Sequence, residues 1–157
     1  MTSDTGSSVR LARIALAGLS LTLAGCAHSP EAATDVSHKV IEGRDAFYDG
    51  ARVGEKTIIV VGKHGKILRT DDQGESWVIV SSGVDRPLFS VAFADAMHGA
   101  IVGASGAYLE SADGGLTWKP RSLGVERQLF LVRFVQNGPG FIVGEFGTFL
   151  RTETSGR

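Results

Sequence analysis

Two arginines recur beside acidic residues at the same place in a repeat, and a third arginine lies close to that place in the preceding copy. Arg86 and Arg127 each follow an acidic residue and stand 127 − 86 = 41 residues apart, and Arg44 lies within one residue of the same place one interval earlier. A guanidinium group offers a rigid fork of donors that matches a carboxylate. This spacing raises the hypothesis that Arg44, Arg86 and Arg127 line one rim of the fold and bind an acidic or carboxylate-bearing partner segment. The simpler interpretation, which the sequence favours, is that each arginine pairs with its neighbouring acid in a solvated loop and contributes little to stability.

A second group of polar residues recurs in a turn motif. Residues Ser111 to Trp118 fit the pattern S-x-D-x-G-x-T-W, and residues Thr70 to Trp77 fit it with conservative exchanges. In such a turn the aspartate accepts bonds from backbone N–H groups, glycine supplies a positive φ, and tryptophan buries a large apolar area. We interpret the motif as a structural turn rather than a catalytic site. Its defining residues are Thr70, Asp72, Gly74, Trp77, Ser111, Asp113, Gly115 and Trp118.

The remaining reactive side chains form no recognisable catalytic set. The four histidines lack the spacing of metal ligands, and Cys26 is the only cysteine, so no Cys-based zinc site or internal disulfide is possible. The 16 basic and 17 acidic residues leave no positive excess for binding nucleic acid. The sequence therefore predicts no metal, no cofactor and no enzymatic activity.

The elements that position these residues form a repeat. Equivalent glycines stand at Gly62, Gly103 and Gly144, which are again 41 residues apart (103 − 62 = 41 and 144 − 103 = 41). A fixed period of this length marks an architecture in which each copy is one supersecondary unit that must stack on its neighbours.

Within one copy, short runs predict β-strands. Phe89, Val91 and Phe93 alternate with Ser90 and Ala92, a period of two that predicts a strand with one apolar face. Four short antiparallel strands fit into each period, as in a propeller blade. We therefore predict an all-β partial β-propeller of about three four-stranded blades, over residues 44–82, 83–123 and 124–157. Equivalent residues should fill the core between the sheets: Val61, Val102 and Val143; Ile67, Tyr108 and Phe149; Leu68, Leu109 and Leu150.

The combined pattern resembles a known family. The turn motif resembles the Asp-box, or bacterial neuraminidase repeat. Joined to the upstream strand "RPLFSVAFADAMHGAIVG", it is similar to the photosystem II stability/assembly factor family and its relatives in non-photosynthetic bacteria. The resemblance runs from about Arg44 to the end. It implies a β-propeller fold. In the photosynthetic members the implied role is to bind a membrane-protein precursor during assembly, whereas in the non-photosynthetic relatives that substrate is absent and the role is open.

Two alternatives concern the extent and class of the propeller. Propellers usually close with 4–8 blades, so we expect the sequence to be a fragment of a larger propeller, the rival being a short protein completed by self-association. A fragment of a sialidase-like Asp-box glycan hydrolase, or of a glycan-binding propeller, is the alternative function. The catalytic site of such hydrolases consists of an arginine cluster and a tyrosine–glutamate pair, which come from many blades.

The N-terminal segment has the pattern of a targeting signal. Arg10 and Arg13 precede a short apolar run, and Leu23-Ala24-Gly25-Cys26 resembles the lipobox of bacterial lipoproteins. We predict a signal peptide over residues 1–25, a lipidated Cys26 and a flexible tether over residues 26–43. The alternative is an ordinary secretory signal with an incidental cysteine. The lipobox resemblance implies a lipid anchor in the bacterial envelope. Ala27 follows the cysteine, and in such lipoproteins the absence of Asp at this position favours the outer membrane, facing the periplasm. The resemblance to assembly factors implies a protein partner that is a membrane protein or an envelope complex.

Overall fold

The computed structural model describes residues 40–135 and 138–152. The chain divides into two units, residues 1–31 and 32–157, and all described residues belong to the second. The predicted signal peptide, Cys26 and the tether up to residue 39 therefore lie outside the described residues. Within the described part of the chain, no helix is both long enough and apolar enough to cross a membrane.

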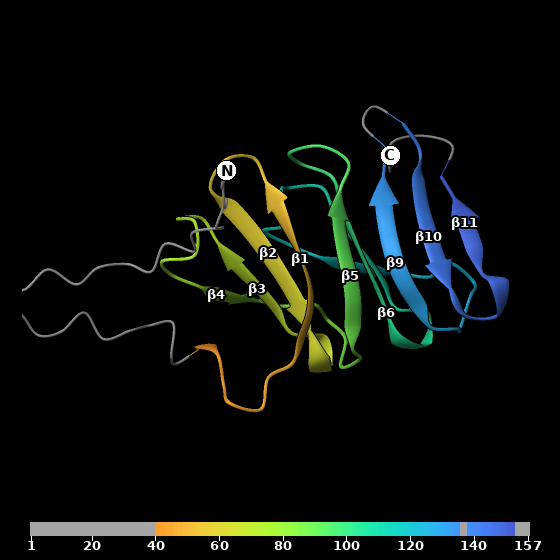
Figure 1. The fold of residues 1–157 in the computed structure, drawn as a ribbon, viewed down its shortest axis with the longest axis horizontal. Helices are drawn as coiled ribbons and strands as arrows, with labels where there is room; N and C mark the ends of the chain where they lie inside the picture. The colour runs from red at the N-terminus through yellow and green to blue at the C-terminus, as the bar shows by residue number, and fades with distance from the viewer. Residues whose placement is uncertain (1–39, 136–137, 153–157) are drawn as a thin grey trace, which may run out of the picture. The chain divides into compact units, whose positions relative to one another are not determined.

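Within residues 40–135 and 138–152, eleven strands form three antiparallel sheets, each a meander in chain order (Figure 1). The first sheet contains β1 (Phe47–Val53), β2 (Thr57–Gly62), β3 (Ile67–Thr70) and β4 (Val78–Val80). The second contains β5 (Leu88–Phe93), β6 (Gly99–Gly103), β7 (Tyr108–Ser111) and β8 (Lys119–Arg121). The third contains, within the described residues, β9 (Leu129–Phe134), β10 (Gly140–Gly144) and β11 (Phe149–Arg151). The first strands β1, β5 and β9 lie side by side. This arrangement confirms the predicted all-β partial propeller, and we refer to the sheets as blades 1, 2 and 3.

A 3₁₀ turn joins the second and third strand of every blade. The turns are η1 (Lys63–Gly65), η2 (Ala104–Gly106) and η3 (Glu145–Gly147). Each ends in a glycine with positive φ, and at Gly106 a Cβ atom would lie 1.7 Å from the Val125 carbonyl oxygen of the next blade. Only glycine therefore allows turn η2 to approach the loop that leads into blade 3.

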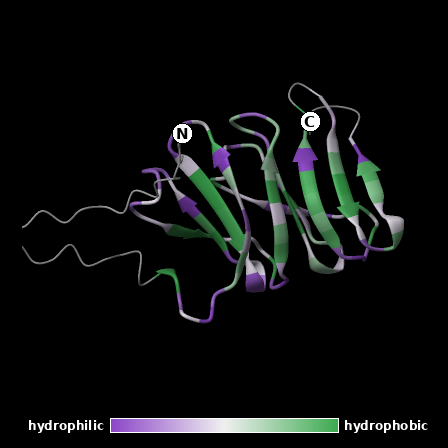
Figure 2. Ribbon diagram, viewed as in Figure 1, coloured by the Kyte–Doolittle hydropathy of each residue, from purple (hydrophilic) through white to green (hydrophobic). Residues whose placement is uncertain are grey.

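Strands β5, β6 and β7 of the middle blade are largely buried on both faces, which corrects the one-sided pattern predicted from the sequence. Val91 is 2 % exposed, but Ser90 and Ala92, on the opposite face, are only 1 % and 8 % exposed. The reason is that blade 2 packs between two other sheets, so small residues on the second face are covered as well. Figure 2 shows the corresponding concentration of hydrophobic residues along the strands.

The core consists of two clusters, one for each pair of neighbouring blades. Trp118 belongs to the cluster between blades 1 and 2, and Tyr108 to the cluster between blades 2 and 3. The predicted core positions are buried in blades 1 and 2, but in blade 3 Val143 is 38 % and Phe149 is 61 % exposed. For these two residues the prediction is wrong, because no described strand covers that face of blade 3.

Hydrogen bonds also join the three first strands. The Asp49 carboxylate on β1 accepts bonds from the Ser90 hydroxyl at 2.8 Å and from the Val91 N–H at 3.1 Å. The Ser90 hydroxyl oxygen in turn accepts a bond from the Val132 N–H at 3.3 Å. The buried polar groups on the second face of β5 are therefore satisfied, as burial requires.

Candidate partner-binding rim

The blades have two ends that differ in chemistry. At one end, which we call the box edge, residues 70–77 and 111–118 join the third strand to the fourth. At the other end, which we call the 3₁₀ rim, turns η1, η2 and η3 lie beside the loops that lead into β1, β5 and β9. The three 3₁₀ turns lie along the lower side of the sheets in Figure 1. The predicted site residues divide between these two ends.

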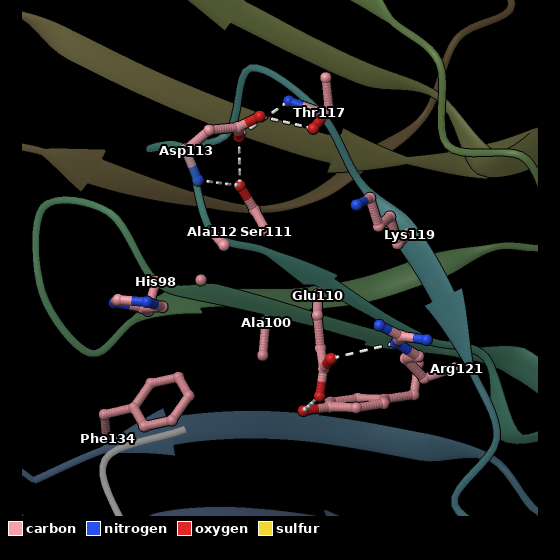
Figure 3. Close-up of a pocket in the computed structure, with 12 residues that line it drawn as sticks. His98, Ala100, Glu110, Ser111, Ala112, Asp113, Thr117, Lys119, Arg121 and Phe134 are labelled. Carbon is pink, nitrogen blue, oxygen red and sulfur yellow. Dashed lines mark hydrogen bonds and ion pairs between the residues drawn. The ribbon is translucent and has the colours of Figure 1, made fainter. Parts of the chain in front are cut away.

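At the box edge, the aspartates are bonded within their own turns. One Asp113 oxygen accepts bonds from the Thr117 N–H at 2.9 Å and the Ser111 hydroxyl at 2.8 Å, and the other accepts the Thr117 hydroxyl at 2.5 Å (Figure 3). Asp72 has the same arrangement in blade 1, with the Ser76 N–H at 2.9 Å, the Ser76 hydroxyl at 2.5 Å and the Thr70 hydroxyl at 2.6 Å. Each turn thus places the donors that its carboxylate needs.

These hydrogen bonds keep both carboxyl groups ionised. Burial alone raises the pKa of Asp113, but the bonds from Thr117 and Ser111 outweigh burial and lower the pKa to about 2. The side-chain and backbone bonds from Ser76 likewise lower the pKa of Asp72. A carboxylate with a low pKa whose lone pairs are occupied by its own turn is poorly suited to act as a general acid or base. The arrangement instead stabilises the turn.

The two box tryptophans are placed differently. Trp118 is 6 % exposed and meets Phe93 edge-on, with ring centroids 5.8 Å apart. It belongs to the buried cluster between blades 1 and 2. Trp77 is only partly buried, and its indole N–H donates to the Gly74 carbonyl at 3.1 Å. The glycines of the two boxes, Gly74 and Gly115, have φ of 98° and 86°.

A pocket of about 220 Å³ lies beside the second box (Figure 3). Its apolar wall includes Ala100 and Phe134, which are one period after Ile59 and Phe93 (100 − 59 = 41 and 134 − 93 = 41). Ile59 and Phe93 pack with Trp118 between blades 1 and 2. The pocket therefore occupies, between blades 2 and 3, the place that corresponds to this packed site.

The polar groups in the pocket bond to one another. Glu110 accepts bonds from the Tyr108 hydroxyl at 3.0 Å and from Arg121 Nε at 3.3 Å. Burial, followed by the charge of Glu110, raises the pKa of Tyr108 well above its usual value, so this phenol stays protonated. Among the described residues, no group of three or more His, Cys, Asp or Glu side chains is placed to hold a metal ion.

At the 3₁₀ rim, two of the three predicted arginines occupy equivalent places. Arg86 Nη1 donates to the Ser105 carbonyl at 2.9 Å, and the Arg127 guanidinium lies 5.4 Å from the centre of the Phe146 ring. Ser105 and Phe146 are themselves equivalent, at the middle of turns η2 and η3 (146 − 105 = 41). Both arginines therefore lie beside the middle residue of their own blade's 3₁₀ turn.

Neither arginine pairs with the acid that precedes it in the described chain. Asp85 instead lies 3.3 Å from His64 Nδ1 of turn η1. Within the described residues, no carboxylate forms an ion pair with Arg86 or Arg127. Their guanidinium groups therefore keep N–H donors that a partner's carboxylate can use.

Arg44 does not share this position. The residue equivalent to Arg86 in blade 1 is Asp45 (86 − 45 = 41), which forms an ion pair with Lys66. The hydrogen bond from Lys66, followed by the backbone bond at Glu42, lowers the pKa of Asp45. The row of equivalent arginines therefore contains Arg86 and Arg127, with Arg44 one residue out of register.

Three aromatic residues near the rim form a row that the sequence pattern did not predict. Tyr48, Phe89 and Phe130 are each the extra residue of a β-bulge at the start of β1, β5 and β9. Their rings meet in order, with centroids 5.6 Å apart between Tyr48 and Phe89 and 6.1 Å apart between Phe89 and Phe130. The spacing of these residues could have indicated the contact, because they are 41 residues apart (89 − 48 = 41 and 130 − 89 = 41) and so hold equivalent places in neighbouring blades.

A comparison with known protein families found one matching family model. A family model described as photosynthesis system II assembly factor YCF48 matches residues 74–157, which is 157 − 74 + 1 = 84 residues and more than half of the chain. No curated protein matches.

Two solved structures share the fold. One is YCF48 bound to a D1 peptide, with 24 % sequence identity and a TM-score of 0.61. The other is YCF48 from Cyanidioschyzon merolae, with 21 % identity and a TM-score of 0.63. Each comparison covers 72 % of this chain and 39 % of the other chain, so this chain spans about two fifths of their length. These matches confirm the resemblance to assembly-factor propellers that was predicted from the sequence.

Proposed function

The chain belongs to the family of the photosynthesis system II assembly factor YCF48, and on that premise we propose that it is a non-catalytic propeller that binds a protein partner during the assembly of a membrane-protein or envelope complex. One observation at the rim carries the proposal. Arg86 and Arg127 lie at equivalent places beside turns η2 and η3, and neither pairs with its neighbouring acid. The structure of a YCF48 with a D1 peptide supports a peptide as the kind of partner.

In this proposal the arginines contact the partner's carboxylates. A guanidinium group donates two parallel hydrogen bonds to a carboxylate, which fixes orientation as well as affinity. Two such groups on neighbouring blades favour an acidic segment over a single charged residue.

Charge reversal tests this contact. We expect R86E/R127E to bind a fluorescently labelled peptide of alternating glutamate and serine, with a free C-terminal carboxylate, about tenfold more weakly than the unaltered chain, measured by fluorescence anisotropy. The matched control is K119E, since Lys119 is an exposed cation on β8 near the box edge. Equal affinities for R86E/R127E and the unaltered chain would remove the arginines from the proposal.

We also propose that Cys26 carries a lipid and anchors the protein in the bacterial envelope, at the outer membrane facing the periplasm. The support is the sequence Leu23-Ala24-Gly25-Cys26 and the polar, alanine-rich stretch that follows it. A lipidated cysteine with several acyl chains holds a protein on a membrane without a spanning helix. Expression of C26S in bacteria, with fatty-acid labelling and envelope fractionation, tests this. We expect label and membrane association in the unaltered protein and neither in C26S, whereas labelling of C26S would exclude Cys26 as the site.

A further inference from the structure

The aromatic row at the rim has the geometry of a binding strip. Tyr48, Phe89 and Phe130 come from three different blades, yet their rings are 5.6 Å and 6.1 Å apart. Each belongs to a β-bulge, which is a feature that re-aims a side chain out of the regular pleat. The same irregularity in every blade thus produces one continuous line of aromatic rings.

These rings remain accessible to solvent. Tyr48 is 48 % and Phe130 is 50 % exposed. Phe89 lies between the other two rings and is still only partly buried. Exposed apolar patches of this kind mark interaction sites in soluble proteins. Phe89 is the middle ring of the row, so its partial exposure shows that the middle of the strip is accessible as well as its two ends.

We propose that Tyr48, Phe89 and Phe130 bind the apolar side chains of an extended partner peptide that lies across the blades, an inference that rests on the proposed function. In an extended chain, alternate side chains are roughly 6.4–6.8 Å apart. This repeat is close to the spacing of the rings. An extended segment with apolar residues at alternate positions therefore places one such residue near each ring.

The charge of the surroundings further defines the occupant. Arg86 precedes Phe89 by three residues, and Arg127 precedes Phe130 by three residues, on the same rim (89 − 86 = 3 and 130 − 127 = 3). Acidic residues among the other positions of the peptide would complement these guanidinium groups. The partner segment is thus extended, apolar at every second position and acidic elsewhere.

The experiment compares two peptides and two double variants. The first peptide alternates leucine with glutamate, and the second replaces each leucine by serine. The test variant is Y48S/F130S, which leaves the partly buried Phe89 in place so that the fold is retained. The matched control is M97S/L116S, because Met97 and Leu116 are 50 % and 57 % exposed and lie at the box edge: Leu116 belongs to the second box, and the Met97 carbonyl accepts a bond from the Gly114 N–H of that box.

We expect Y48S/F130S to bind the leucine peptide about tenfold more weakly and to bind the serine peptide as the unaltered chain does. M97S/L116S should bind both peptides normally. Tyr48→Trp supplies a second measurement, since its emission should change on addition of the leucine peptide beyond any change seen in the unaltered chain.

Unchanged binding of the leucine peptide by Y48S/F130S would overturn the inference. Sedimentation of both proteins supplies a second outcome that would overturn it: self-association of the unaltered chain that Y48S/F130S lacks would make the strip a contact between copies of the chain. If R86E/R127E loses the serine peptide while Y48S/F130S still binds the leucine peptide, the proposed function stands and this inference fails. The reverse result would retain the strip and remove the arginine contact.

Discussion

The box edge and the 3₁₀ rim carry charged side chains at the same 41-residue interval, but they treat them in opposite ways. At the box edge, both oxygens of Asp113 accept bonds from Thr117 or Ser111 of the same turn. At the rim, Arg86 contacts a backbone carbonyl and Arg127 an aromatic ring, and neither meets its neighbouring acid. A repeated charge is therefore not by itself a sign of a binding site. What distinguishes the two edges is whether the charge is already satisfied within the chain.

The largest effect is expected when the buried indole at the box edge is removed. Trp118 is 6 % exposed and packs between blades, so W118A should lower the free energy of unfolding by about 3–5 kcal/mol. The matched variant W77A should cost about 1–2 kcal/mol, because Trp77 is only partly buried. Urea denaturation followed by circular dichroism measures both. Equal losses would contradict the assignment of Trp118 as the residue that joins blades 1 and 2.

The second test asks whether the close approach of turn η2 to the next blade stabilises the rim. A Cβ atom at Gly106 would lie 1.7 Å from the Val125 carbonyl oxygen, whereas a Cβ atom at Gly147 meets nothing within 4 Å. The two glycines have φ of 71° and 72°, so G147A carries only the strain of that conformation. We expect losses of about 2–4 kcal/mol for G106A and about 1–2 kcal/mol for G147A. Thermal unfolding of the pair decides the point, and a smaller loss for G106A would mean that the blades are not interlocked at this turn.

The smallest expected effect is a pH dependence that comes from the box edge. The folded-state pKa of Asp113 is lowered to about 2 from an ordinary value of 3.8. The stability that this carboxylate contributes is therefore present above pH 3.8 and is lost as the pH falls through about 2. The free energy of unfolding should fall between about pH 4 and pH 2, and the fall should be shallower in D113N. Since the pKa values of Asp72 and Asp95 are lowered as well, D113N should retain part of the fall. Parallel profiles for the two proteins would exclude the proposed role of Asp113.

The repeat predicted the architecture because a period of 41 residues constrains what each copy must bury. The repeat identified the equivalent glycines Gly62, Gly103 and Gly144, which end β2, β6 and β10. It also predicted the meander of short strands, since glycines and alternating apolar residues are local signals. It did not identify the burial of Ser90, because the second face of β5 is covered by another sheet rather than by its own sequence neighbours.

The aromatic strip was missed for a related reason. The alternation of Phe89, Val91 and Phe93 predicts a regular strand, and a bulge that displaces Phe89 depends on the register with β6. The arginine interval was visible in the sequence, but the partners of Arg86 and Arg127 were not. Those partners lie in turns η2 and η3, about 19 residues further along the chain.

The affinity of the glutamate–serine peptide, measured by anisotropy for D113N and for R86E/R127E side by side, shows whether the partner binds at the 3₁₀ rim or at the box edge. We expect D113N, although less stable, to bind the peptide like the unaltered chain wherever it is folded, and R86E/R127E to be folded normally yet bind about tenfold more weakly. The opposite pattern, with binding lost in D113N and kept in R86E/R127E, would place the partner at the box edge and contradict the account.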